Sequence, residues 1–402
     1  MKTTMDCPMR NVMAAAAMGI LVLTSACGGG NDETFAAANM QPVTVGPGPA
    51  NNINLLFTTV ELCTHGNATE CQLIDHVLVD TGSTGLRILA SVLSPSLLLR
   101  QQTDTIGSPL VECGQFVNGF TWGSVKIADI RIAAELARSA PMQIIGDPDF
   151  FNVPASCSSI GPPRNTAQAL GANGILGVGM FLQDCGAPCA QNAISGTYYV
   201  CPASGCRPVS VSLPRQVQNP VGMFSLDNNG IIIDLPSIAD AGASSVNGSL
   251  IFGIDTRGNN VPFNAQVIRV NQNTGTFNTL LNGVNYSNSF VDSGSNALYF
   301  ASSSIPGCPG NPDFDCPAST LNLSATMRSA TGAGALVNFS VTNAETLFAS
   351  HPTFFAFDNI AGTNSDASQF DWGLPFFFGR KVFIALEGQS TPLGVGPYVA
   401  FQ

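Results

Sequence analysis

Two similar stretches of this 402-residue sequence carry the strongest information about its fold. Residues 76–89 read HVLVDTGSTGLRIL, and residues 288–300 read NSFVDSGSNALYF. In each, an apolar run leads into Asp-Thr/Ser-Gly-Ser, and the two align without gaps around Asp80 and Asp292. Each is followed by an apolar segment that contains glycine: GANGILGVGMF at 171–181 and WGLPFFFGRKVFIAL at 372–386. The repetition predicts two related halves that supply one aspartate each.

The residue types of the motif indicate how each aspartate is held. The apolar run is typical of a buried strand, and Gly82 or Gly294 permits a tight turn with backbone close to the carboxylate. Ser83 or Ser295 can donate a hydrogen bond to that carboxylate. Two carboxylates that meet share one proton, which places an acid beside a base. The alternative is a pair of separate turn aspartates with a structural role only.

Thr81 and Ser293 directly follow the two aspartates. They either exchange hydrogen bonds across the pair or serve as ordinary turn hydroxyls, and the sequence leaves both possibilities open. The first possibility would tie the two turns to each other.

The order of the motifs resembles that of the pepsin-like, bilobal aspartic peptidases over most of the chain. The resemblance implies an all-β fold of two related β-barrel-like lobes with a cleft between them, residues 51–220 with Asp80 and residues 221–402 with Asp292. It also implies that the two aspartates are catalytic and activate a water for peptide hydrolysis. The matching motifs are VDTGS at Asp80, VDSGS at Asp292, GILGVG at Gly174, MFSLDNNG at Met223, GSLIFGIDT at Gly248 and WGLPFFFGRKVFIAL at Trp372.

The chain departs from this family where the resemblance implies a flap over the substrate. Arg87 stands where a tryptophan is usual, five residues after the glycine of the first motif. The flap region, CGQFVNGFTWGSVKIADI at 113–130, contains no tyrosine. Phe116 and Trp122 are therefore candidates to cover a substrate, or else ordinary core residues. We expect Arg87 to pair with a surface carboxylate rather than with substrate.

Composition limits the function classes. Charged residues make up 10% of the sequence and the net charge is -11, so a row of phosphates could not be neutralised and nucleic acid is not an expected partner. Many short β-type runs bounded by Gly, Asn, Pro and Ser predict a mainly β protein. Helices are expected only near residues 90–102 and 343–351.

The N-terminus has the pattern of a targeting segment. Lys2 and Arg10 precede an apolar run at residues 12–23, and LTSAC follows at 23–27. The pattern favours a bacterial lipoprotein signal over residues 1–27, with lipid on Cys27; an ordinary secretory signal is the alternative. Residues 28–50 are expected to form a flexible tether. The protein is thus expected in the bacterial cell envelope, lipid-anchored to the membrane and facing the periplasm or the cell exterior.

Ten cysteines remain when Cys7 and Cys27 are set aside. An even number in an oxidising compartment predicts up to five disulfides, and Cys63–Cys71 and Cys308–Cys316 are plausible local pairs. A zinc site in residues 185–206, CGAPC…CPASGC, is a weaker alternative because the spacing is poor and no histidine lies nearby. We expect neither a metal nor a cofactor.

Three hypotheses about function follow. The first is a monomeric, exported, membrane-anchored aspartic endopeptidase that acts on peptide or protein substrates through Asp80 and Asp292. The altered flap motivates the second, a non-catalytic pepsin-fold lipoprotein that binds peptides or proteins. The third is a disulfide-stapled lipoprotein whose lobes only scaffold partners.

Overall fold

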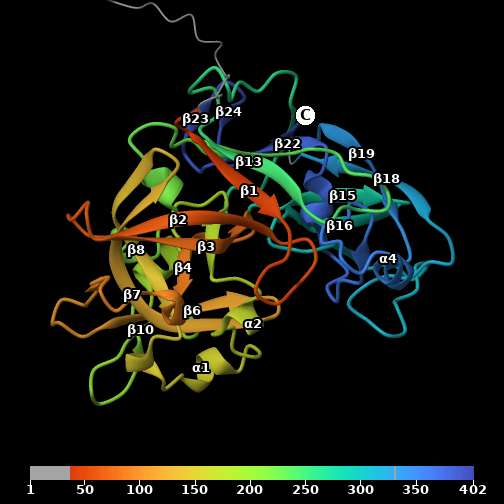
Figure 1. Ribbon diagram of the computed structural model, residues 1–402. Coiled ribbons are helices and arrows are strands. Elements are labelled where there is room, and N and C mark those ends of the chain that lie inside the picture. The colour runs from red at the N-terminus through yellow and green to blue at the C-terminus, as the bar shows by residue number, and fades with distance from the viewer. Residues whose placement is uncertain (1–36, 330–331) are drawn as a thin grey trace, which may run out of the picture. The chain divides into compact units, whose positions relative to one another are not determined.

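Figure 1 shows the computed structural model, which describes residues 37–329 and 332–402. Most of the regular structure in these residues is β-strand, and the α-helices have only 4 to 7 residues each. The prediction of a mainly β protein is therefore confirmed. No helix in the described ranges is long and apolar enough to cross a membrane. The predicted signal segment with Cys27, and residues 28–36 of the predicted tether, lie outside the described residues.

The largest sheet takes strands from the first half of the chain (residues 37–220) and from the second half (residues 221–402). Its order is β11-β10-β6-β7-β8-β4-β9-β3-β2-β1-β13-β12-β22-β25-β14, and β5 attaches to β7. β7 also pairs with β2, which is distant along this order, so strands of the first half close into a barrel-like ring. The strands are β1 (Met40–Val45), β2 (Leu56–Thr64), β3 (Cys71–Asp80), β4 (Thr84–Leu89), β5 (Arg100–Gln101), β6 (Leu110–Phe116), β7 (Gly119–Ile132), β8 (Glu135–Ile145), β9 (Gly174–Val178), β10 (Tyr198–Val200), β11 (Arg207–Pro208), β12 (Gly230–Leu235), β13 (Val246–Phe252), β14 (Gln266–Arg269), β22 (Arg380–Ala385) and β25 (Tyr398–Phe401).

A second sheet belongs to the second half alone, and its order is β19-β18-β15-β16-β21-β17-β20. Figure 1 draws several of these strands side by side in green to blue. The strands are β15 (Phe277–Leu281), β16 (Val284–Val291), β17 (Leu298–Phe300), β18 (Leu321–Arg328), β19 (Gly334–Val341), β20 (Ala361–Gly362) and β21 (Phe370–Trp372). A small third sheet pairs β23 (Ser390–Thr391) with β24 (Gly394–Val395).

Short helices lie in the connections between strands. The α-helices are α1 (Ala155–Ser158), α2 (Ala167–Leu170), α3 (Ala187–Gln191) and α4 (Ala344–Ser350). The 3₁₀ helices are η1 (Ala90–Val92), η2 (Pro148–Phe150), η3 (Leu213–Arg215), η4 (Pro220–Met223) and η5 (Leu374–Phe377).

Burial along the strands follows the residue pattern. In β15, Phe277, Thr279 and Leu281 are buried and the residues between them are partly exposed, as in a sheet with one covered face. In β3, residues 77–80 are all buried, because β3 lies between β9 and β2 in the large sheet. A continuous apolar run is typical of such an enclosed strand, and it leads directly to Asp80.

Two expectations about local structure are wrong. The predicted tether includes β1, which pairs with β2 on one side and with β13 on the other and buries Val43 and Val45. The helix expected at residues 90–102 is limited to the single 3₁₀ turn η1. The helix expected at 343–351 is present as α4, which begins after Asn343; its side chain accepts a hydrogen bond from the Thr346 N–H and so caps the helix.

Candidate active site at the Asp80 and Asp292 turns

Each aspartate lies at the end of a central strand, beside a parallel neighbour. β3 ends at Asp80, which is in register with Gly177 of β9. β16 ends one residue before Asp292, whose N–H donates to the carbonyl of Trp372, the last residue of β21. In each half, two parallel strands thus end side by side, and the turn with the aspartate lies at their ends. This arrangement fixes the position of each aspartate with respect to its own sheet.

The two carboxylates accept equivalent hydrogen bonds. The Gly82 N–H donates to Asp80 Oδ1 at 2.8 Å, and Ser83 Oγ donates to Asp80 Oδ2 at 2.5 Å. In the other turn the Gly294 N–H donates to Asp292 Oδ1 at 2.8 Å, and Ser295 Oγ donates to Asp292 Oδ2 at 2.9 Å. The roles predicted for these glycines and serines match the geometry: each turn orients its carboxylate with one backbone and one hydroxyl donor.

The glycines also show how closely the two turns face each other. A Cβ atom on Gly82 would lie 2.7 Å from Asp292 Cγ, and one on Gly294 would lie 2.8 Å from Asp80 Oδ1. Both separations are too short for real contacts, so each turn needs glycine because the opposite aspartate occupies the space of a side chain. Gly82 is exposed, which places this pair of turns at the surface of the described chain.

Thr81 and Ser293 join the two turns by reciprocal hydrogen bonds. The Ser293 N–H donates to Thr81 Oγ1 at 2.9 Å, and the Thr81 N–H donates to Ser293 Oγ at 3.1 Å. Each hydroxyl also donates to a carbonyl of the opposite strand, Thr81 to Val291 at 3.2 Å and Ser293 to Val79 at 2.8 Å. Of the two possibilities that the sequence left open, the structure has the reciprocal one, and it holds the two aspartates together.

The pKa of Asp292 is raised well above its usual value of 3.8. Burial is the main cause, because it disfavours the charged form, and the negative charge of Asp80 adds to it. The side chains of Asp80 and Asp292 are also within hydrogen-bonding reach of each other. The environment of Asp292 therefore favours its protonated form. The site can place a proton donor and a proton acceptor on the two sides of one small molecule or bond.

Asp371, which is not among the predicted site residues, is a third carboxyl at this site. The apolar segment at residues 372–386 is not a single strand: Trp372 ends β21, and η5 and β22 follow. The strand beside Asp292 begins earlier, at Phe370, and so includes Asp371. A signal was available, because a gapless alignment of Gly177 with Gly373 places Asp371 in a strand next to the motif.

The structure separates the two flap candidates. Trp122 is buried, its indole N–H donates to the Phe150 carbonyl at 2.6 Å, and its ring packs edge-on against Tyr199. It is a core residue here. Phe116 ends β6 in the β6–β7 hairpin and is partly exposed, and the guanidinium of Arg87 lies 5.9 Å from its ring centre. The flap role stays a prediction for Phe116 alone.

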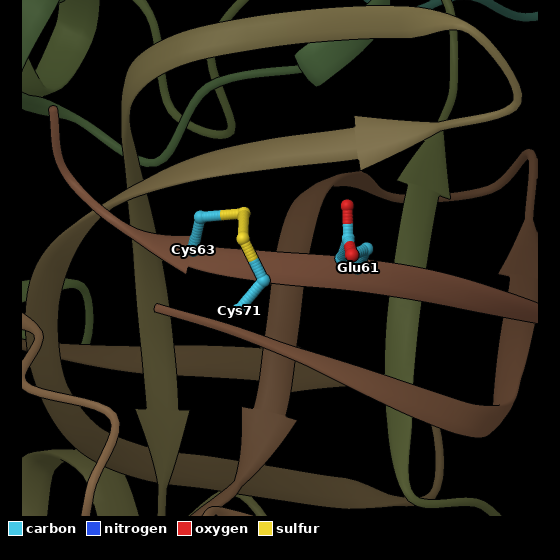
Figure 2. Close-up of side chains that lie close together, drawn as sticks. All are labelled: Glu61, Cys63 and Cys71. Carbon is cyan, nitrogen blue, oxygen red and sulfur yellow. A yellow bond between two sulfur atoms is a disulfide. The ribbon is translucent and has the colours of Figure 1, made fainter. Parts of the chain in front are cut away.

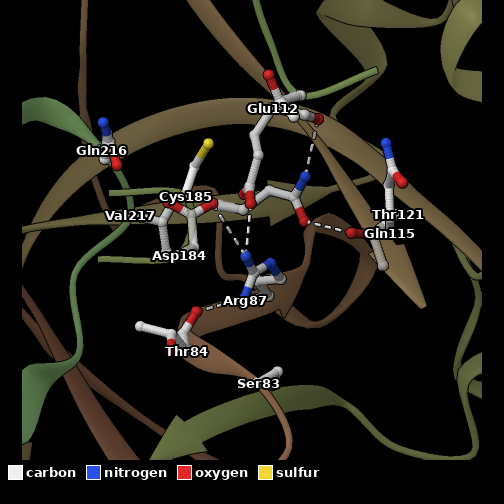
Figure 3. A network of polar contacts seen from close by, with 12 residues as sticks. Ser83, Thr84, Arg87, Glu112, Gln115, Thr121, Asp184, Cys185, Gln216 and Val217 are labelled. Atoms are coloured by element: carbon white, nitrogen blue, oxygen red, sulfur yellow. Dashed lines mark hydrogen bonds and ion pairs between the residues drawn. The ribbon is translucent and has the colours of Figure 1, made fainter. Parts of the chain in front are cut away.

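Arg87 does not pair with a surface carboxylate, which corrects the expectation. Its Nη2 lies 2.5 Å from Glu112 Oε1 and 3.4 Å from Asp184 Oδ2, and its Nη1 donates to the Thr84 carbonyl at 2.7 Å. Arg87 and Glu112 are only 4% and 1% exposed. Figure 3 shows this network, in which Glu112 and Asp184 point toward Arg87. Tyr198 completes it by donating to Asp184 at 2.6 Å.

The cysteines described by the structure are paired as disulfides. The predicted pairs Cys63–Cys71 and Cys308–Cys316 are confirmed, and the others are Cys113–Cys157, Cys185–Cys189 and Cys201–Cys206. Residues 185–206 therefore offer no free thiolate for the zinc site considered there. Glu61 lies close to the first disulfide (Figure 2), but disulfide sulfurs are not thiolate ligands, and Glu61 pairs with Arg131 at 3.0 Å.

Residues 35–401 match a family described as "Protein of unknown function (DUF3443)". The chain belongs to this family. No curated protein matches it. The DUF3443 description carries no activity, so the function of this chain has to be argued from its own site.

The reciprocal hydrogen bonds of this DUF3443 site give a first prediction. Thr81→Val and Ser293→Ala are each expected to lower the free energy of unfolding by about 1–3 kcal/mol, because each leaves buried partners unsatisfied. Each hydroxyl bonds backbone groups and not the other hydroxyl, so the two losses should be close to additive in the double variant. Urea unfolding of the four proteins measures both quantities.

Ser302→Ala is the matched control, because the Ser302 hydroxyl bonds only to Ser304 in an exposed turn. Its effect is expected within about 0.5 kcal/mol of zero. Losses at Thr81 and Ser293 as small as that at Ser302 would contradict the reciprocal arrangement.

Proposed function

We propose that this protein is an exported, membrane-anchored aspartic endopeptidase with a pepsin-like, bilobal fold. The observation that carries the proposal is the equivalent hydrogen-bonded setting of Asp80 and Asp292, on two turns that bond each other through Thr81 and Ser293. A pair of structural turn aspartates needs neither a shared contact nor glycines kept free by the opposite carboxyl. The raised pKa of Asp292 supports a dyad that carries one proton.

In the proposed reaction, Asp80 and Asp292 hold a water between them. The ionised carboxylate of Asp80 takes a proton from the water as its oxygen bonds to the peptide carbonyl carbon. Asp292 gives its proton to the carbonyl oxygen, which produces a neutral diol. The proton on Asp80 then passes to the amide nitrogen while Asp292 regains one from a diol hydroxyl, and the C–N bond breaks to release a carboxylic acid and an amine. Atoms and charge balance, and no cofactor enters any step.

The setting of the enzyme is part of the proposal. Five disulfides in the described residues favour an oxidising compartment, which agrees with export. Lipid on Cys27 would hold the monomer at a membrane of the bacterial cell envelope, facing the periplasm or the exterior. Peptides or unfolded proteins would bind as extended strands across the two turns.

The test is incubation of the full-length protein, purified with its disulfides formed, with a mixed peptide library from pH 3 to 7. Products are read by mass spectrometry, beside the Asp80→Asn/Asp292→Asn double variant. Cleavage by the wild type alone is the expected result, and the products define the sequence preference. A folded wild type that cleaves nothing at any pH would overturn the peptidase and favour the non-catalytic peptide-binding protein.

A further inference from the structure

The strand registers place Asp371 on the same face as the dyad. In β21, Asp371 is in register with Phe290 of β16 and with Tyr299 of β17. Registered neighbours point to the same face of a sheet, and so do residues two apart along one strand. Phe290 is two residues before Asp292, so the side chain of Asp371 emerges on the dyad side. Trp372, the next residue, points the other way.

The corresponding position in the first half is apolar. Ile175 of β9 is in register with Leu78, two residues before Asp80, and with Arg87, seven residues after it. Asp371 has the same relation to Asp292, because Phe290 and Tyr299 occupy those offsets. The strand registers around the dyad are thus the same in the two halves, and at this position one half has Ile175 where the other has a carboxyl.

Asp371 is buried without a full set of partners. Its side chain is 5% exposed, and its Oδ1 has no hydrogen-bond partner among the described residues. Tyr299 does not supply one, because its hydroxyl donates to Asn296 at 2.6 Å. The pKa of Asp371 is raised to about 8, mainly by burial. A hydrogen bond from Ser295 lowers this pKa, and the negative charge of Asp80 raises it. An unsatisfied buried oxygen of this kind costs stability unless a ligand uses it.

We propose that Asp371 is a specificity-determining residue that binds a cationic side chain, lysine or arginine, of a peptide lying across the dyad, on the Asp292 side of the scissile bond. The inference rests on the proposed function. Three carboxyl groups lie close together here, since the charges of Asp80 and Asp371 both contribute to the raised pKa of Asp292. A substrate cation donates to the free oxygen of Asp371 and stabilises the ionised form of its carboxyl. On the other side of the dyad, Ile175 favours an apolar side chain.

The test uses matched peptides that differ only in one residue. That residue is next to the bond that is cleaved, on the Asp292 side of it. That residue is lysine, norleucine or glutamine. Norleucine keeps the alkyl chain of lysine without its charge, and glutamine offers neutral donors. We expect kcat/KM for the lysine peptide to exceed that for the norleucine peptide by about tenfold to a hundredfold, as for a hydrogen bond to a charged group. Equal kcat/KM values for the lysine and glutamine peptides would overturn the preference for a cation and indicate a neutral polar pocket.

Two substitutions at position 371 should remove the preference. Asp371→Asn keeps the shape without the charge, and Asp371→Ile copies the other half, so the ratio of lysine to norleucine should fall to near one in both. Asp358→Asn is the matched control: its pKa is also raised by burial, to about 6, but it lies with Trp372 around a cavity on the opposite face of β21. Its ratio should stay at the wild-type value.

The lysine preference should also grow as pH rises from 5 towards 8. Asp371 must lose its proton to form the ion pair, and below its pKa of about 8 that loss opposes binding. The charged and titratable groups that bear on Asp371 are Asp80, Asp292 and Tyr299, and none of them is cationic.

The outcomes separate this inference from the peptidase itself. Cleavage without a lysine preference, or a preference that survives Asp371→Asn, overturns the role of Asp371 and leaves the peptidase intact. If no peptide is cleaved, the same three peptides are titrated into the wild type and Asp371→Asn by calorimetry. Tighter binding of the lysine peptide to the wild type alone then supports the cation site without turnover, and equal binding overturns it.

Discussion

Replacing Asp292 with asparagine is expected to lower the rate of peptide hydrolysis by about 10²–10⁴-fold, and Asp80→Asn should have an effect of the same size. Asparagine retains the size of each side chain and can accept the N–H of Gly294 or Gly82. It cannot exchange a proton with water or with a carbonyl oxygen. The loss should therefore appear in kcat, with little change in the binding of peptides, and steady-state kinetics on one peptide from the library measures it.

The free energy of unfolding should increase in Asp292→Asn, although the rate of peptide hydrolysis falls. The pKa of Asp292 is raised in the folded protein, so between about pH 4 and that raised value the unfolded chain loses a proton that the folded one keeps. The folded state binds more protons, and the free energy of unfolding therefore falls as pH rises. Asparagine removes this penalty, so the variant should gain stability over the wild type at pH 7 and much less at pH 4. Thermal unfolding at both pH values tests the sign.

Asp315→Asn is the control for this experiment. Asp315 is buried in the same half with its pKa raised to about 6, so its replacement should also change the pH dependence of stability. It should leave peptide hydrolysis near the wild-type rate, because Asp315 lies outside the two turns. An Asp292→Asn protein that is folded and hydrolyses peptides at the wild-type rate would falsify the dyad.

Arg87→Ala is expected to destabilise the fold by about 3–5 kcal/mol, because it leaves buried carboxylates without their cation. Arg87 contacts Glu112 and Asp184, and the pKa of Asp184 is already raised well above 3.8 by burial and by Glu112. Without the guanidinium, the folded protein has to bury negative charge that no cation offsets. The loss should be larger at pH 8 than at pH 5, and urea unfolding at the two pH values measures it.

Arg131→Ala provides the comparison. Its guanidinium pairs with Glu61, but the two side chains are 32% and 31% exposed, so the expected loss is about 0–1 kcal/mol. A triple variant, Arg87→Met with Glu112→Gln and Asp184→Asn, removes the charges together and should recover much of the stability lost by Arg87→Ala. Equal losses for the two arginines would contradict the importance of burial at Arg87.

The sequence predicted those features that depend on neighbouring residues. The turns at Asp80 and Asp292 could be recognised because the strand, the glycine and the hydroxyl lie within a few positions of each aspartate. The close disulfides, such as Cys63–Cys71, could be recognised for the same reason. In each case the local geometry is set by residues that are close in the sequence.

Features that depend on distant partners could not be predicted in the same way. Arg87 is buried because Glu112 and Asp184 meet it from other strands, and nothing near Arg87 in sequence indicates them. Asp371 lies at the dyad because of the register between β21 and β16, not because of a motif around it. The short β1 is stabilised by pairing on both edges, which its own six residues do not reveal.

The pairing of β1 also constrains the order in which the protein can fold. Met40 is in register with Ile251, and Val45 with Val246, so this early strand has no partner on that edge until β13 has been synthesised. Contacts of such long sequence separation form slowly, because a long loop has to close first. A chain that emerges from the ribosome from its N-terminus onward therefore carries β1 with one unpaired edge until β13 has followed. During that interval the edge is open to pairing with other chains, so folding of β1 only after β13 has been made is the safer course.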